Sequence, residues 1–186
     1  MYVVVASDTG TNRSVTGADR FNLHADPQGI ERIAVAREHA PLRSFLANVN
    51  ASGSIFATLA CKIWSATEAG GAETKIFASY IDVIFLQEST NFGCGPHEEL
   101  ARRLAQLLER EPGEALRAEL RICPVVFAAD EDGFCLRIIL YAHGETLEQA
   151  RVRWGLGLAR VQQALLFVAR ELRREQGVPG AEQEIL

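Results

Sequence analysis

The chain has few of the residues that mark several large protein classes. Among its 186 residues, Lys62 and Lys75 are the only lysines, and the formal net charge is −5. Binding nucleic acid by neutralising phosphates requires a basic excess, so this balance argues against that class. The longest apolar helical run, Ala164 to Ala169, is far too short to span a bilayer. We therefore expect neither nucleic acid nor a membrane as a partner.

Signal features and paired cysteines are also missing. The opening residues MYVVVASDTG have no basic start and no apolar core of signal-peptide length, which predicts a cytoplasmic protein. In that compartment we expect the four cysteines to be buried thiols rather than disulfides. No two of them have the Cys-x-x-Cys spacing of a zinc site. The sequence therefore predicts no metal and no cofactor.

The remaining composition is that of an ordinary globular domain, with 48% hydrophobic and 23% charged residues. An apolar strand at 2–6 precedes a polar stretch from Ser7 to Gly17, so we interpret residues 1–25 as an N-terminal strand and a flexible arm. One domain is expected at 26–176. Residues 177–186 are expected to form a polar tail.

Hydrophobic periodicity predicts an α+β fold, in which an antiparallel sheet packs against helices. The first strand pair is rich in β-branched and aromatic residues and is separated by turn glycines. In the segments before and after this pair, apolar residues recur at helical spacing. Each of these segments has a proline near its start, where proline can begin a helix. The predicted strands are 54–65 and 75–87, and the predicted helices are 28–38, 41–49 and 95–110.

The segment Leu120 to Ala142 predicts a β-hairpin. Its residues 130–133, Asp-Glu-Asp-Gly, are typical of a turn that ends with glycine in the left-handed conformation. This turn would place Val125 roughly opposite Ile139. Both faces of the hairpin are then apolar, and one of them has no obvious partner within the chain.

A long closing helix is predicted from Leu147 to about Arg174. The sequence Thr-Leu-Glu-Gln at 146–149 fits a capping box at its start. Apolar residues then follow at spacings of four and three, which favours packing of the helix on a protein surface. They are Trp154, Leu158, Val161, Leu165, Val168 and Leu172. We interpret them as intramolecular core in preference to an intermolecular coiled coil.

Two short motifs contain residue types used in catalysis. Cys94 and His97 lie at a predicted helix start, where the helix dipole favours a thiolate. Asp8 opens the sequence Asp-Thr-Gly-Thr, which resembles the turn of aspartic proteases and the phosphate loop of actin-like ATPases. The protease framework strand is missing and the ATPase needs a longer chain, so we interpret this motif as a polar turn. Cys123 and Cys135 are expected well apart on the hairpin.

Residues Pro124 to Leu172 combine an acidic Asp-Gly turn, two strands and an apolar-periodic closing helix. This segment resembles the C-terminal half of the type III secretion chaperone-like fold, a group that includes bacterial sensory transduction regulators. The resemblance implies a dimer that binds an extended segment of another polypeptide and has no catalytic residues. The chain departs from the pattern in its N-terminal strand and arm and in the length of its last helix.

These observations favour a non-enzymatic, chaperone-like or adaptor protein, expected to be a homodimer, whose partner is another polypeptide. The alternatives are a small enzyme or ligand-binding protein that uses Cys94 and His97, or a structural subunit of a larger complex. No catalytic residue is assigned, and Cys94, His97 and Asp8 are candidates only. The residues predicted to bind a partner are Val125, Phe127, Ile139, Tyr141 and Trp154.

Overall fold

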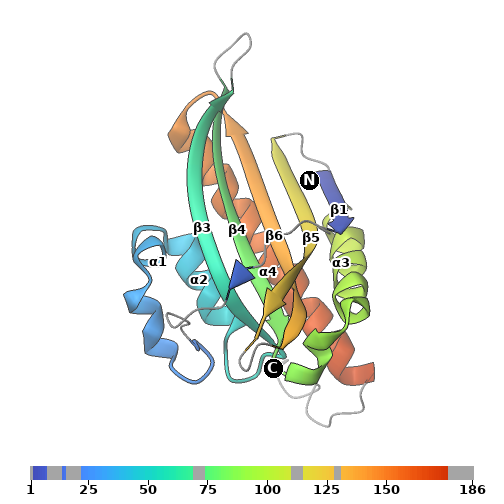
Figure 1. The fold of residues 1–186 in the computed structure, drawn as a ribbon. Helices are drawn as coiled ribbons and strands as arrows, with labels where there is room; N and C mark the ends of the chain where they lie inside the picture. Colours follow the sequence, from blue (N-terminus) through green and yellow to red (C-terminus); the bar gives the residue numbers. More distant parts are fainter. Residues whose placement is uncertain are drawn as a thin grey trace, which may run out of the picture.

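The computed structural model describes residues 2–7, 14–15, 22–68, 74–109, 115–127 and 131–175. Within them, six strands form one sheet in the order β1-β5-β6-β4-β3, and β2 also pairs with β5 (Figure 1). The strands are β1 (Tyr2–Ser7), β2 (Ser14–Val15), β3 (Phe56–Glu68), β4 (Thr74–Phe85), β5 (Leu116–Val126) and β6 (Asp132–Gly144).

The sheet combines antiparallel and parallel pairing. Its four long strands, β3 to β6, are antiparallel, whereas β1 and β2 run parallel to β5 along one edge. The helices are η1 (Pro27–Arg32), α1 (Ala34–Glu38), α2 (Ala40–Val49), η2 (Glu88–Phe92), α3 (Cys94–Leu108) and α4 (Leu147–Glu175). The predicted α+β class, with a long C-terminal helix behind an antiparallel sheet, is confirmed.

The predicted helix at 28–38 is interrupted in the middle. Residue Ile33 is extended, with φ −86° and ψ 102°, and separates the 3-10 helix η1 from α1. Ile30 and Ala36 are both buried in the core. Six residues apart, they would face different sides of a continuous α-helix, so the extended residue lets both reach the core.

Helix α4 begins with the predicted cap and lies close to the sheet. The backbone N–H of Gln149 donates to Thr146 Oγ1 at 3.1 Å, and the Gln149 side chain accepts from the N–H of Glu145 at 2.8 Å. A Cβ added to Gly157 would lie 3.0 Å from Leu116 Cδ2 and 3.1 Å from Leu140 Cδ2. This glycine therefore permits the close approach between helix and sheet.

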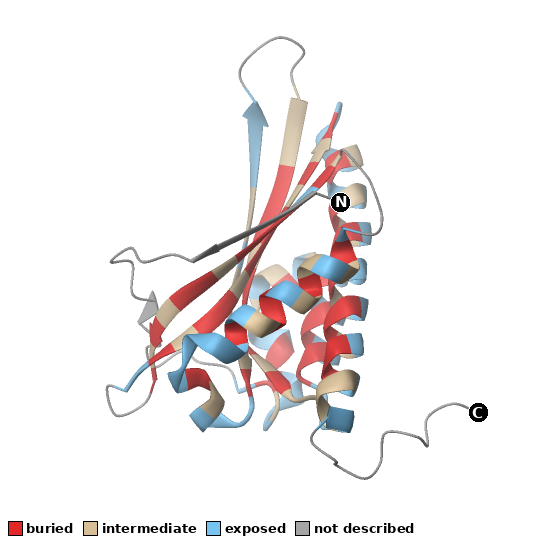
Figure 2. Cartoon of the chain, turned by 90° about the vertical axis from the view of Figure 1, so that its right-hand side faces the viewer, coloured by how far each residue is buried: buried red, intermediate tan, exposed pale blue. Residues whose placement is uncertain are grey.

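The core lies between the sheet and the helices (Figure 2). The α4 stripe from Trp154 to Val168 is buried there, and Leu172 is half-buried against it. The stripe is therefore intramolecular core. Along the described residues, no helix has the length and apolar character needed to cross a membrane.

The predicted register of the β5–β6 hairpin is wrong by several residues. Val125 pairs with Gly133, and not with Ile139, and the pairing continues to Phe127, whose N–H donates to Glu131 O at 2.8 Å. Gly133 lies within β6 and outside the left-handed region. A Cβ there would lie 2.6 Å from the Phe127 ring and 2.8 Å from Asn91 O, so close packing explains this glycine.

Candidate functional site

Cys94 and His97 lie in different environments. Cys94 is exposed at the first residue of α3, whereas His97 is fully buried and packs edge-on against Phe85, with ring centroids 5.2 Å apart. Both ring nitrogens of His97 lack a hydrogen-bond partner within the part of the chain that the structure describes. Burial lowers the pKa of His97 to about 4. Its imidazole is therefore a neutral group of the core at physiological pH.

This burial predicts that acid destabilises the fold. The unfolded chain binds a proton at His97 below about pH 6.5, but the folded protein does so only near pH 4. The contribution of His97 to the free energy of unfolding is therefore fully present above pH 6.5. It is lost as the pH falls from about 6.5 to about 4, by up to about 3 kcal/mol in all. Urea unfolding at about pH 7 and about pH 5 measures the difference.

The control is the variant His97→Leu, which should unfold with much less pH dependence in the same window. Burial also lowers the pKa of His39, so a smaller slope of the same sign remains. Hydrogen bonds from Arg102 and Arg103 lower the pKa of Glu99 to about 2, so that carboxylate affects stability only below about pH 4.5. An unchanged slope in His97→Leu would show that His97 is not the group responsible.

Two of the cysteines lie together, contrary to the prediction. Cys123 and Cys135 are directly paired across β5 and β6, and both are buried. Their mutual hydrogen bond, followed by burial, raises the pKa of the Cys135 thiol. Burial, followed by Asp82, raises the pKa of Cys61 to about 11. The described residues contain no group of His, Cys, Asp or Glu side chains arranged to hold a metal ion.

The predicted binding residues fall in three different places. Trp154 lies in the main core with no exposed surface, so it cannot contact a partner in this fold. Val125 and Phe127 are buried in a small second cluster with the two paired cysteines. Ile139 is buried, and Tyr141 is half-buried on the side of the sheet opposite α4. The candidate Asp8 lies outside the described residues.

Tyr141 belongs to an aromatic cluster that the sequence did not reveal. The small residue Ala78 pairs with Trp64 on β3 and with Tyr141 on β6, so the two rings meet across it with centroids 6.0 Å apart. The Tyr80 ring lies 6.5 Å from that of Trp64. All three rings are half-buried. They lie on the side of the sheet that no described helix covers (Figures 1 and 2).

Two guanidinium groups extend this cluster. The Arg137 guanidinium lies 4.4 Å from the Tyr80 centroid, and that of Arg117 lies 5.6 Å from the Tyr141 centroid, both within the range of cation–π attraction. Burial, followed by the charge of Asp82, raises the pKa of Tyr80, so its hydroxyl stays protonated. We call Trp64, Tyr80, Tyr141, Arg117 and Arg137 the aromatic–arginine face.

Two carboxylates hold the arginines of this region in place. Asp82 pairs with Arg137 in the β4–β6 ladder and accepts from its Nε at 2.7 Å and its Nη2 at 2.8 Å. Glu119 accepts from Arg121 Nε at 2.7 Å and lies 3.9 Å from Arg117. These ion pairs fix the guanidiniums against the sheet. The face offers apolar rings and directed N–H donors, which suit recognition rather than bond-breaking chemistry.

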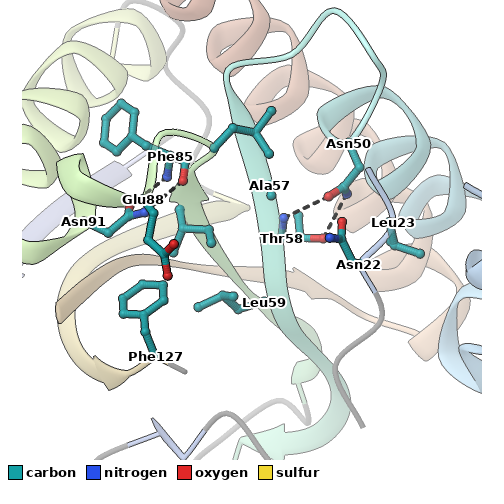
Figure 3. Close-up of a pocket in the computed structure, with 12 residues that line it drawn as sticks. Asn22, Leu23, Asn50, Ala57, Thr58, Leu59, Phe85, Glu88, Asn91 and Phe127 are labelled. Carbon is teal, nitrogen blue, oxygen red and sulfur yellow. Dashed lines mark hydrogen bonds between the residues drawn. The ribbon is translucent and has the colours of Figure 1, made fainter. Parts of the chain in front are cut away.

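A cavity of about 190 Å³ lies at the end of the sheet near η2 (Figure 3). The two buried amide side chains in its lining, those of Asn50 and Asn91, form hydrogen bonds with residues of β3 and β4. Asn91 accepts from the N–H of Phe85 at 2.9 Å and donates to Phe85 O at 2.8 Å. Asn50 donates to Thr58 Oγ1 at 2.9 Å and accepts from its N–H at 3.0 Å. These amides brace the ends of β3 and β4.

The aromatic–arginine face is therefore the candidate functional site. Its residues come from four neighbouring strands, β3, β4, β6 and β5, which the sheet order brings side by side. Comparisons of the chain with protein-family models, with curated proteins and with solved structures gave no match.

Proposed function

We propose that this protein is a cytoplasmic, non-enzymatic binding module, chaperone-like or adaptor in type, which binds another polypeptide and acts as a homodimer. The observation that carries the proposal is the aromatic–arginine face. Tryptophan, tyrosine and arginine are the side chains most enriched at the centres of protein interfaces. Here they are half-exposed, held by neighbours and uncovered by any described helix. The four cysteines are free thiols, in keeping with a reducing compartment.

An extended polypeptide suits the neighbouring edge of the sheet. β3 is an edge strand of 13 residues, and among the described strands it pairs only with β4. A segment that adds to β3 as a further strand would gain backbone hydrogen bonds. Its side chains would then lie beside Trp64, which projects from β3. Lys62, on the same strand, protects the free edge from indiscriminate pairing.

The charge of the face argues against a single-stranded nucleic acid as its ligand. Aromatic rings and arginines also stack on bases. However, Asp82 and Glu119 neutralise Arg137 and Arg121, and the chain as a whole carries a net charge of −5. A ligand that is mostly apolar, with a few acidic groups to meet Arg117, fits this balance better than a phosphate backbone.

The test uses fluorescently labelled, reduced α-lactalbumin as an unfolded probe, with binding followed by anisotropy. We expect the double variant Trp64→Ala/Tyr141→Ala to bind at least about tenfold more weakly than the unaltered protein, since it removes two interface anchors. Phe92→Ala is the matched control, because Phe92 is an exposed aromatic residue on η2. Equal binding by the double variant, or preference for a single-stranded oligonucleotide, would refute the proposal.

A further inference from the structure

Two buried cysteines face each other across β5 and β6. Cys123 and Cys135 are directly paired in the ladder and are 4% and 0% exposed. Val125 and Phe127 are the other buried members of their cluster. In antiparallel strands, directly opposed residues have Cα atoms about 4.5 or about 5.5 Å apart, and both spacings fall within the range that a disulfide spans. The fold therefore already holds the two thiols at bonding range.

The hydrogen bonds of the ladder identify which of the two spacings applies. The N–H of Phe127 donates to the O of Glu131, which lies directly opposite, so these two residues form a hydrogen-bonded pair. Hydrogen-bonded and non-hydrogen-bonded pairs alternate along antiparallel strands. Pro124, which has no N–H, lies at a non-hydrogen-bonded position, as this alternation requires. Cys123 and Cys135 are therefore a hydrogen-bonded pair, with Cα atoms about 5.5 Å apart.

This kind of pair favours a disulfide that is easily reduced. The Cβ atoms of directly opposed residues are about 4.5 to 5.5 Å apart, and they are farther apart in hydrogen-bonded pairs. A disulfide requires about 3.5 to 4.5 Å, so closing it must draw the two strands together by about 1 Å at this point. A disulfide closed under such strain is labile, so it suits reversible formation better than permanent bracing.

The surroundings keep both thiols reduced until an oxidant is supplied. The hydrogen bond with Cys123, followed by burial, raises the pKa of Cys135, so little thiolate is present at neutral pH. The exposed thiol of Cys94 should therefore react before the buried pair. Access to the pair requires local opening of the sheet. The outer strands are interrupted at this point, since β1 pairs with β5 as far as Ile122 and β2 begins its pairing at Val125. The pair is thus suited to sustained oxidation.

We propose that Cys123 and Cys135 form a redox site, at which a peroxide closes a reversible disulfide between β5 and β6. The Cys123 thiolate attacks one peroxide oxygen, the O–O bond breaks, and hydroxide leaves, which gives a sulfenic acid. The Cys135 thiolate then attacks the Cys123 sulfur, the S–O bond breaks, and a second hydroxide leaves. The two hydroxides and the two thiol protons give two water molecules. The thiols lose two electrons and the peroxide gains them. The site operates whether or not the aromatic–arginine face binds a polypeptide.

Peptide mapping of the unaltered protein tests this site. The folded protein is incubated with hydrogen peroxide at about pH 8, where more thiolate is present, and the peroxide is then removed with catalase. Remaining thiols are alkylated with iodoacetamide in guanidinium chloride. Trypsin cuts after Arg121 and Arg137, so both cysteines lie in one peptide, residues 122–137. We expect this peptide to be unalkylated and lighter by two hydrogen atoms, and its two halves to stay linked after cleavage at Glu131.

Reduced glutathione, added after the catalase, should lower the amount of linked peptide at least about tenfold. Cys61→Ala is the matched control and should give the linked peptide in full, because Cys61 packs against the main core on the other side of the sheet. In Cys123→Ala, Cys135 should remain available for alkylation. Full alkylation of both cysteines after peroxide treatment would overturn the inference. So would a disulfide of either one with Cys61 or Cys94, or a linked peptide that glutathione leaves intact.

Discussion

Replacing Asp82 by alanine should lower the free energy of unfolding by about 3 to 5 kcal/mol, because it leaves a largely buried guanidinium without its partner. The Asp82 side chain is almost completely buried, and that of Arg137 is 24% exposed. Two hydrogen bonds, of 2.7 and 2.8 Å, join them across β4 and β6. Urea denaturation followed by circular dichroism measures the change.

The double variant Asp82→Leu/Arg137→Met is the informative comparison. It removes both charges and fills the site with apolar groups, so it should be more stable than Asp82→Ala. The ion pair of Glu99 with Arg102 is the solvent-exposed counterpart, and Glu99→Ala should have a much smaller effect. If Asp82→Ala and Glu99→Ala proved equally mild, burial would not determine the strength of the Asp82–Arg137 pair.

Periodicity in the sequence predicted the elements of the fold better than their pairing. Helix α2 was foreseen because Leu42, Phe45, Leu46 and Val49 recur at helical spacing, and all four are buried. The capping residues near Thr146 marked the start of α4. These features succeed because they depend on neighbours within one or two helical turns. The break at Ile33 depends on the distant core and was not foreseen.

The apolar pattern alone did not select the hairpin register, because the predicted and observed partners of Val125, Ile139 and Gly133, lie on the same face of β6. A one-residue slip would move the core set to the other face, and the pattern excludes it. A shift by an even number of residues keeps each side chain on its own face, so the pattern does not exclude it. The acidic residues led to a predicted turn at 130–133, but β6 already begins at Asp132. For this reason the sequence did not predict the pairing of Cys123 with Cys135.

The aromatic–arginine face was missed for a related reason. Tyr80 and Asp82 interrupt an otherwise apolar strand at alternate positions, and a carboxylate in such a strand predicts a cationic partner. That signal was present in the sequence. The sequence does not identify the arginine that pairs with Asp82, because Arg137 is 55 residues away and only the β4–β6 register brings the two together.

Replacing Trp154 by alanine should cost about 3 to 5 kcal/mol, the range for truncating a large buried aromatic side chain. Trp154 has no exposed surface, and its ring lies 5.1 Å from that of Phe77 in an edge-on contact. Its Nε1 donates to Ser79 Oγ at 2.9 Å. Alanine would leave both a cavity and a buried hydroxyl without its donor. Thermal and urea unfolding measure the loss.

The two tryptophans of the chain make this prediction a test of the functional argument as well. Trp64→Ala, on the side of the sheet that no described helix covers, should weaken binding of the unfolded probe with little change in stability. Trp154→Phe should restore most of the lost packing but not the hydrogen bond to Ser79, and it should bind the probe normally. If Trp154→Phe lost binding while remaining folded, a residue of the core would be contributing to recognition, and the aromatic–arginine face would not be sufficient.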